Sequence, residues 1–273
     1  MTVTPSRRAA VLGHPIDHSL SPVLHRAAYA ELGFDGVYAA IDVTSEQLQA
    51  FLDGCGDDWV GLSLTMPLKE SVIALLDDVD ERARSVRSVN TVVFEDGCRR
   101  GFNTDIAGFD TILGDAGIDS SSTATIVGAG ATARSAMAAL AARGVSRVDV
   151  RARRLAAASE LAALGARMGV EAAAGDWPIA AQSLSTDVVI STVPAEVGTP
   201  LWIPARPELL IDVLYHPWPT PLAAAWASAG GSVVGGLELL VGQAVEQVEL
   251  MTGSRPDPDG MRDAGTAALA QRT

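Results

Sequence analysis

The sequence predicts an α/β protein that contains a doubly wound, mostly parallel sheet. Short apolar runs alternate with Ala- and Leu-rich helical stretches along the chain, which is the pattern of repeated strand–helix–strand units. A glycine-rich turn, Gly128-Ala129-Gly130, lies between one of these runs and the helix that follows it. Hydrophobic residues make up 48% of the 273-residue chain, which is sufficient for the cores of two domains.

The first part of the chain is predicted to alternate strands and helices. Apolar runs place strands at residues 9–12, 38–43, 59–64 and 91–94. A helix is expected after Pro22, and a polar helix that carries arginines ends near Ser88.

A second strand–helix series begins at Thr123, after one connecting helix that we expect within residues 108–122. Its predicted strands lie at residues 124–127, 147–150, 187–190, 209–213 and 232–234, and its predicted helices at residues 131–143 and 155–168. A further helical stretch, 237–251, could pack back on the first part. We therefore predict three segments, 1–106, 107–236 and 237–273.

Composition argues against several classes of partner. The net charge of −13 repels nucleic acid and anionic membrane surfaces. We find no signal peptide and no run of the roughly 18 apolar residues that a membrane span requires, so we expect a cytoplasmic protein. No cluster of His, Cys and Asp has metal-ligand spacing, and we predict no metal site.

The segment from Gly128 to Ala133 fits the pattern G-x-G-x-x-A and predicts a phosphate-binding turn. Gly128 permits the tight turn, Gly130 lets the backbone approach a pyrophosphate, and Ala133 lets helix and strand pack closely. Helix N–H groups and the helix dipole would then bind the phosphates, as in a Rossmann-type domain.

The end of the next strand indicates which dinucleotide is bound. Asp149 is the usual distance from the glycines for a ribose-binding acid, but it lies between two valines inside the strand. The strand ends in arginines, Arg151, Arg153 and Arg154, which suit the 2′-phosphate of NADP. We favour NADP(H); the alternative is that the arginines belong to a solvated turn.

Several polar residues stand where strands end or helices begin. Ser19 and Ser21 precede a helix, where they could bind a carboxylate, although Ser21 suits a helix N-cap equally well. Lys69 follows a buried strand and opens a helix, a position that disfavours a cation and hints at function, although a surface lysine remains an alternative. Asn90 could be a turn residue, and Asp105 could be an N-cap.

Taken in order, these segments resemble the shikimate dehydrogenase family over nearly the whole chain. The matching pieces are His18-Ser19-Leu20-Ser21-Pro22, Thr65-Met66-Pro67-Leu68-Lys69, Val89-Asn90-Thr91, Asn103-Thr104-Asp105, Gly128 to Ala133, and Gly235-Gly236-Leu237 through Gln243-Ala244. The resemblance implies an N-terminal α/β substrate domain, a Rossmann-type NADP domain, a C-terminal helix that returns to the first domain, and a substrate held between the domains. It leaves the oligomeric state open, with a homodimer as one possibility.

The resemblance also implies an activity, the reversible NADPH-dependent reduction of 3-dehydroshikimate to shikimate in aromatic amino-acid biosynthesis. Lys69 and Asp105 would form the catalytic pair. The implied substrate-binding residues are Ser19, Ser21, Ser63, Thr65, Asn90, Tyr215 and Gln243. The implied cofactor-binding residues are Gly128, Ala129, Gly130, Ala131, Thr132, Ala133, Arg151, Arg153, Arg154, Thr192, Val193 and Gly236.

The chain departs from the family pattern in three places. Ser63 stands where asparagine is common, which could remove one substrate hydrogen bond or route it through water. Arg26 replaces a common asparagine and is expected on the surface. The arginine loop reads Ala152-Arg153-Arg154, which keeps positive charge but loses two neutral hydrogen-bonding side chains.

Three alternatives to this function remain at the level of sequence. The first is an NAD-preferring relative that acts on quinate or an aminated shikimate, for which Asp149 is the best support. The second is a non-catalytic NADP(H)-binding sensor on the same fold, which would not need Lys69 and Asp105. The third is a Rossmann-type protein with an unrelated activity.

Overall fold

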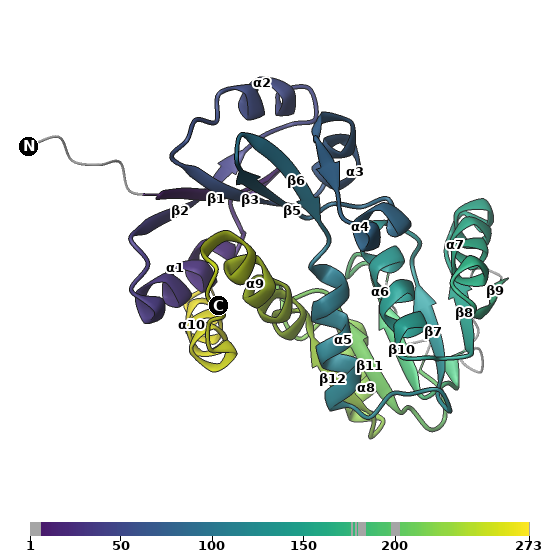
Figure 1. Ribbon diagram of the computed structural model, residues 1–273. Helices are drawn as coiled ribbons and strands as arrows, with labels where there is room; N and C mark the ends of the chain where they lie inside the picture. The colour runs from purple at the N-terminus through teal and green to yellow at the C-terminus, as the bar shows by residue number, and fades with distance from the viewer. Residues whose placement is uncertain (1–6, 176, 178, 180–183, 198–202, 273) are drawn as a thin grey trace, which may run out of the picture. The chain divides into compact units, whose positions relative to one another are not determined.

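The computed structural model describes residues 7–175, 177, 179, 184–197 and 203–272 (Figure 1). The chain forms two compact units. The first contains the residues up to Thr104 together with Leu240–Thr273, and the second contains Asp105–Leu239. Among the helices within these residues, none is long and apolar enough to cross a membrane.

The first unit is built on a six-stranded sheet with the strand order β2-β1-β3-β5-β6-β4. Its strands are β1 (Arg7–Gly13), β2 (Gly36–Asp42), β3 (Trp59–Leu64), β4 (Asp78–Val79), β5 (Thr91–Glu95) and β6 (Cys98–Phe102). Its helices are α1 (Ser21–Leu32), α2 (Leu48–Asp53), α3 (Leu68–Ser71), the 3-10 helix η1 (Val72–Leu75), α4 (Glu81–Val86), most of α9 (Gly236–Thr252) and α10 (Pro258–Ala270). Helices α1 and α10 pack side by side (Figure 1).

This sheet is mixed, whereas the sequence pattern predicts a mostly parallel one. Strands β1, β2 and β3 are parallel, but β5 is antiparallel to both β3 and β6. The reason is a two-residue hairpin turn, since Asp96 and Gly97 both have positive φ, at 50° and 77°. Asp-Gly is a preferred sequence for such a turn because both positions must adopt left-handed conformations.

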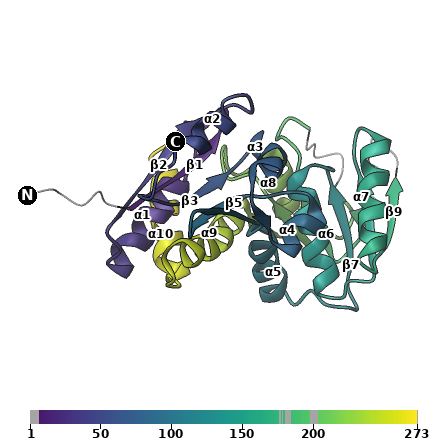
Figure 2. The same ribbon diagram turned by 45° about the horizontal axis from the view of Figure 1, so that its top comes forward.

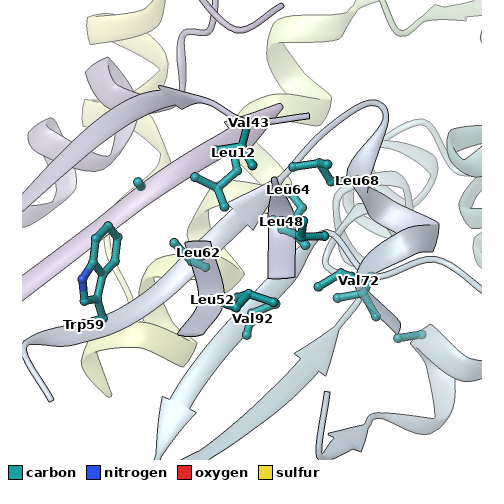
Figure 3. Packing of buried hydrophobic residues seen from close by; sticks show 13 residues of the cluster. Leu12, Val43, Leu48, Leu52, Trp59, Leu62, Leu64, Leu68, Val72 and Val92 are labelled. Carbon is teal, nitrogen blue, oxygen red and sulfur yellow. The ribbon is translucent and has the colours of Figure 1, made fainter. Parts of the chain in front are cut away.

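One core of the first unit lies on the face of the sheet that α2, α3 and η1 cover. Buried leucines and valines from strands and helices meet there, among them Leu12, Leu62, Leu68 and Val72 (Figure 3). Trp59, 7% exposed, lies at the end of this cluster and packs edge-to-face on Phe51. The packing fixes where β1 and β3 end, and the loops after both strands carry residues of the predicted site.

The second unit contains a six-stranded, fully parallel sheet with the order β12-β11-β10-β7-β8-β9. Its strands are β7 (Thr123–Val127), β8 (Arg147–Arg151), β9 (Glu171–Gly175), β10 (Val188–Ser191), β11 (Leu209–Asp212) and β12 (Ser232–Gly235). Its helices are α5 (Asp105–Asp115), α6 (Ala131–Ala142), α7 (Leu155–Arg167) and α8 (Pro221–Ser228). Helices α6 and α7 pack together beside β7 and β8 (Figure 2).

The strand order of the second unit is that of a Rossmann fold. Numbered within the unit, the strands run 3-2-1-4-5-6, and the order reverses between β7 and β10. Ligands of such sheets bind outside the carboxyl ends of the strands at this reversal. The α/β class and the Rossmann-type domain are therefore confirmed. Strands β6 and β9 and helix α2 were not predicted.

Candidate active site

The loops after β1 and β3 lie against each other, because the two strands are parallel neighbours. The His14 N–H donates to the carbonyl oxygen of Met66 at 3.0 Å. A Cβ on Gly13 would lie 2.4 Å from Cγ2 of Thr65, so only glycine allows this approach. The contact places Thr65, which is partly exposed, beside the loop that leads to Ser19.

Ser19 and Ser21 stand at the start of α1, but the N-cap interpretation of Ser21 is wrong. Leu20 occupies the N-cap position and makes no side-chain hydrogen bond to the helix. Ser21 is already helical, and its N–H donates to Oγ of Ser19 at 3.3 Å. Ser19 therefore accepts from the first helical N–H, and both serines lie at the helix N-terminus, where the remaining N–H groups and the helix dipole suit an anion.

Asn90 lies at the centre of a buried polar cluster in the first unit. Its side chain is fully buried, and its Nδ2 donates to Oε1 of Gln243 at 2.9 Å and to Oγ1 of Thr104 at 3.0 Å. Its Oδ1 accepts from the Thr104 N–H at 2.8 Å and from the Thr91 hydroxyl at 2.9 Å. The fold thus brings together two predicted site residues, Asn90 and Gln243, that lie far apart in the sequence.

The two predicted catalytic residues are each linked to this cluster through the main chain. Lys69 is partly exposed on α3, and its carbonyl oxygen accepts from the Val89 N–H at 2.8 Å, which fastens α3 to the residues before Asn90. Asp105 begins α5 and is 1% exposed. Because Thr104 donates to Asn90, the backbone just before Asp105 is held in place.

Ser63, also predicted to bind substrate, lies on β3 and is only 3% exposed. Its hydroxyl accepts from the Tyr38 hydroxyl at 2.6 Å and donates to Oε1 of Gln247 at 2.8 Å. Tyr38 and Gln247 were not predicted from the sequence. For Gln247 a signal existed, since it follows Gln243 by four residues on one helix and therefore shares its face.

In the second unit, the predicted glycine turn joins β7 to α6. Gly128 has a φ of +111°, and a Cβ there would lie 2.2 Å from Oγ1 of Thr192, so no other residue fits. The Gly128 N–H donates to the Arg151 carbonyl at 2.8 Å, and the Thr192 N–H donates to the Val127 carbonyl at 2.8 Å. The predicted cofactor residues that follow β7, β8 and β10, namely Gly128, Arg151 and Thr192, thus lie together at one edge of the sheet.

The turn has the features that a dinucleotide's phosphates require. Gly130 is the N-cap of α6, so no side chain caps the first-turn N–H groups of Ala131, Thr132 and Ala133. Gly130 is exposed, and a Cβ placed on it would meet no heavy atom within 4 Å. Open space in front of uncapped helix N–H groups is a suitable place for a pyrophosphate. The residues present therefore fit the cofactor that the sequence predicts.

The arginines after β8 differ in their surroundings. Arg151 crosses to the next strand, since a Cβ on Gly175 would lie 1.6 Å from its Nη1, and it lies 3.8 Å from the Asp149 carboxylate. Arg153 and Arg154 are exposed, immediately before α7. Asp149 thus forms an ion pair with Arg151 on the same strand. Arg153 and Arg154 are the exposed cations of the loop that follows.

The loop that carries Tyr215 is held by a buried carboxylate at the end of β11. Asp212 is 2% exposed and accepts from the Thr220 hydroxyl at 2.6 Å and from the Leu214 N–H at 3.2 Å. Burial raises the pKa of the Asp212 carboxyl. Thr220 in turn caps α8 by accepting from the Ala223 N–H at 3.1 Å. Tyr215 is partly exposed on the loop between these two anchors.

The remaining predicted cofactor residues lie at the same edge of the sheet. Val193 follows Thr192 after β10 and is partly exposed. Gly236 follows β12, and its N–H donates to the Leu214 carbonyl at 3.0 Å. A Cβ on Gly236 would lie 2.1 Å from the Val213 carbonyl oxygen, so the close approach requires glycine. Over the described part of the chain, no group of three His, Cys, Asp or Glu side chains is arranged to hold a metal ion.

Comparison with known proteins gives consistent matches along the chain. Residues 11–92 match the family described as the shikimate dehydrogenase substrate binding domain, and residues 236–264 match the shikimate 5'-dehydrogenase C-terminal domain. A shikimate dehydrogenase (NADP(+)) of Methanothermobacter thermautotrophicus is 35% identical over 267 residues, which cover 93% of this chain and 94% of that protein.

Solved structures agree with these matches. A shikimate 5-dehydrogenase from Mycobacterium fortuitum has a TM-score of 0.85 and 40% identity, with 97% of this chain and 99% of that chain covered. A shikimate 5-dehydrogenase from Thermus thermophilus, solved in complex with NADP(H) and shikimate, has a TM-score of 0.84 and 33% identity, with 96% and 100% covered.

Proposed function

This chain belongs to the shikimate dehydrogenase family, and on that basis we propose that it catalyses the reversible NADPH-dependent reduction of 3-dehydroshikimate to shikimate. It is then an oxidoreductase that acts on a CH–OH group, and it serves aromatic amino-acid biosynthesis. Many related proteins carry the name shikimate dehydrogenase (NADP(+)), and the relative from Thermus thermophilus binds both ligands.

The observation that carries the proposal is the polar cluster around Asn90. It is buried, rich in amide and hydroxyl groups, and joined to Gln243 by a 2.9 Å hydrogen bond. A polyhydroxylated ring requires such neutral donors and acceptors, because each ring hydroxyl must exchange its hydrogen bonds to water for hydrogen bonds to protein. The cluster lies in the unit that contains the matched substrate-binding segment, residues 11–92.

We assign substrate contacts by position within the family pattern. Ser19 and Ser21 bind the carboxylate, supported by their place at the N-terminus of α1. Thr65, Asn90 and Gln243 bind ring hydroxyls, and Tyr215 lines the substrate site.

Lys69 and Asp105 are the proposed catalytic pair. Oxidation of the ring hydroxyl at C3 requires removal of its proton, and reduction requires its return, so a positioned acid–base group is needed at that oxygen. The Lys69 ammonium returns the proton in the direction of reduction. The Asp105 carboxylate accepts a hydrogen bond from the reacting hydroxyl and orients the lysine. NADP(H), when bound, supplies or accepts the hydride.

The second unit is the proposed cofactor domain. The N–H groups at the start of α6 bind the pyrophosphate, with Gly128, Ala129 and Gly130 forming the turn. Arg153 and Arg154 bind the 2′-phosphate, and their exposure at the end of β8 supports this role. Arg151 supports the same loop, while Thr192, Val193 and Gly236 complete the cofactor site.

We further propose that residues 1–106 and 237–273 bind the substrate and residues 107–236 bind the cofactor, and that the protein acts in the cytoplasm. A homodimer remains a prediction. Light scattering on the purified protein measures its mass in solution, and a monomeric mass would contradict the dimer without affecting the activity.

The direct experiment is an initial-rate assay at 340 nm that crosses shikimate and quinate with NADP and NAD. We expect shikimate with NADP to be the preferred pair. Preference for NAD would retain the chemistry but reject the assignment of Arg153 and Arg154 to a 2′-phosphate. Preference for quinate would retain the chemistry but reject shikimate as the main substrate. NADPH binding without turnover of any pair would reject the enzyme and favour the sensor.

A further inference from the structure

A chain of buried hydrogen bonds runs through the first unit from Tyr38 to the proposed substrate site. The Tyr38 hydroxyl donates to Ser63, and the Ser63 hydroxyl donates to Oε1 of Gln247. Nε2 of Gln247 donates to Oγ1 of Thr91 at 3.1 Å. The Thr91 hydroxyl donates to Asn90, whose Nδ2 donates to Gln243. Every group before Gln243 is at most 3% exposed.

Main-chain groups determine the orientation of both central amides. The Asn90 carbonyl oxygen, which can only accept, lies 3.4 Å from the Gln247 side chain, so the nitrogen of Gln247 must face it. The Gln247 oxygen must then face Ser63. The Thr104 N–H, which can only donate, faces the Asn90 side chain at 2.8 Å, so the oxygen of Asn90 must lie there.

The hydrogen bonds therefore all run in one direction. Because Oε1 of Gln243 accepts from Asn90, the Gln243 amide is left with its nitrogen as the end of the chain. Gln243 is partly exposed, unlike the groups before it. Its two N–H donors are the chemistry that would bind an oxygen of a polyhydroxylated ring.

Tyr38, the first donor in this series of hydrogen bonds, is held in place by its neighbours. The Tyr38 ring stacks on the buried His25 ring, with centroids 3.8 Å apart and an interplanar angle of 19°. Its main-chain carbonyl accepts from both Nε and Nη2 of Arg26, at 3.1 and 2.9 Å. Arg26, which is exposed as the sequence predicts, thus ties α1 to the edge strand β2 at Tyr38. Because the Tyr38 ring is held in place, its hydroxyl can donate consistently to Ser63, and the Ser63 hydroxyl is then left to donate to Gln247.

We propose that Tyr38, Ser63 and Gln247 form a positioning relay that acts together with these main-chain contacts to hold the amides of Asn90 and Gln243 in place, so that Gln243 presents its nitrogen to a ring oxygen of the substrate. Ser63 is then a positioning residue and not a substrate ligand. Its hydroxyl donates its one proton to Gln247 and accepts a hydrogen bond from Tyr38, so both interactions are made within the protein. This inference rests on the proposed function.

The relay also explains how the chain functions with serine where the family commonly has asparagine. A serine side chain is shorter and carries a single donor. Here that donor orients Gln247, which lies one helical turn from Gln243, the residue that the family pattern assigns to a ring hydroxyl.

The first test replaces single atoms of the relay. Ser63→Ala removes both links, and we expect the shikimate KM to rise by about 3- to 10-fold, the worth of one neutral hydrogen bond. Tyr38→Phe should also raise the shikimate KM, but by a smaller factor, because Ser63 can still donate to Gln247. The matched control is Tyr29→Phe, since Tyr29 packs on the same aromatic cluster but its buried hydroxyl has no hydrogen-bond partner. NADP affinity should not change.

The second test reverses the direction of the relay. A carboxylate in Gln247→Glu can accept from Ser63 but cannot donate to Thr91 or to the Asn90 carbonyl, so the shikimate KM should rise at about pH 8. Burial at this position raises the pKa of the introduced carboxyl, so protonation restores a donor, and the ratio of variant to parent KM should fall as pH decreases to about 5.5. Burial raises the pKa of Tyr38 and lowers that of His25 to about 4, so neither side chain titrates in this range. Measuring the parent at each pH cancels the pH dependence that both proteins share.

The outcomes separate this inference from the function on which it rests. An active parent together with Ser63→Ala and Gln247→Glu variants that behave like Tyr29→Phe would overturn the relay and leave the function intact. A KM ratio for Gln247→Glu that does not change with pH would also overturn it. A parent that does not turn over shikimate would overturn both, since the relay would have no substrate to position.

Discussion

His25 is a titratable residue enclosed by aromatic and backbone groups. It is 0% exposed and stacks on Tyr38, and its Nδ1 lies 2.9 Å from the Ser21 carbonyl oxygen. A carbonyl can only accept, so Nδ1 carries the proton, and Nε2 is left buried without a partner. Burial lowers the pKa of His25 from 6.5 to about 4, which keeps the ring neutral at physiological pH.

We predict that His25 makes the stability of the protein decrease in mild acid. Between pH 6.5 and about 4 the unfolded chain binds a proton at His25 that the folded protein does not, so the free energy of unfolding falls as pH falls. The total loss is about 3 kcal/mol, and no further loss arises from this group below pH 4. Denaturant unfolding at a series of pH values measures it.

The control for this prediction is a histidine in solvent. His25→Phe keeps a stacking ring and should flatten the pH dependence over this interval, whereas His18→Gln, at an exposed position, should leave it as in the parent. Equal slopes in the parent and in His25→Phe would mean that other groups cause the acid sensitivity.

At the scale of elements, the turn between β7 and α6 separates two roles for glycine. Gly128 is required by the fold, because its φ is positive and a Cβ would strike Thr192. Gly130 is not, because its φ of −86° suits any residue and a Cβ would enter open space. A substitution at Gly130 therefore tests ligand binding separately from folding.

We predict that Gly130→Ala leaves the thermal midpoint near that of the parent but weakens NADPH binding by at least about tenfold, because the methyl group would occupy the approach of the pyrophosphate. Fluorescence titration with NADPH and a thermal melt measure the two quantities. Gly260→Ala on α10, where a Cβ is also unopposed, is the control and should leave NADPH affinity unchanged while the thermal midpoint stays the same or rises slightly. Unchanged NADPH affinity in Gly130→Ala would place the cofactor elsewhere.

Patterns that repeat along the chain predict the elements well. Strands β7, β8, β10 and β11 and helices α6 and α7 follow from apolar runs, and Gly128 to Ala133 lies at the predicted turn. The β5–β6 hairpin was missed although Asp96-Gly97 signals it, because β6 reads Cys-Arg-Arg-Gly-Phe and has little apolar character. An exposed strand of this kind is held by pairing with its neighbour and not by burial.

The site is predicted less completely, because its members depend on tertiary contacts. Asn90 and Gln243 were found through family resemblance, and no local pattern reveals that they meet. Tyr38 reads as an ordinary apolar residue of a strand, and only the fold shows that its hydroxyl reaches Ser63. The N-cap interpretation of Ser21 failed because Ser, Asp and Asn favour caps only on average, and here the helix begins one residue earlier.

At the scale of the molecule, the chain passes between the two units after Thr104 and again after Leu239. Each unit has its own sheet and its own buried core. This organisation predicts that each ligand protects its own unit first.

Hydrogen exchange measures this directly. We expect NADPH alone to slow exchange in the second unit at residues 128–133 and around Thr192, and shikimate alone to slow it in the first unit around Asn90 and Gln243. Protection of the first unit by NADPH, with none at 128–133, would reverse the assignment of ligands to units.

The turnover rate of Lys69→Ala with saturating shikimate and NADP tests whether Lys69 carries the proton transfer of shikimate oxidation. We predict that kcat falls by about 10²- to 10⁴-fold, the usual contribution of a general acid–base group, while NADPH affinity stays at the parent value because the cofactor turn lies in the other unit. A kcat within a few-fold of the parent would contradict this role of Lys69 and require another group to move the proton.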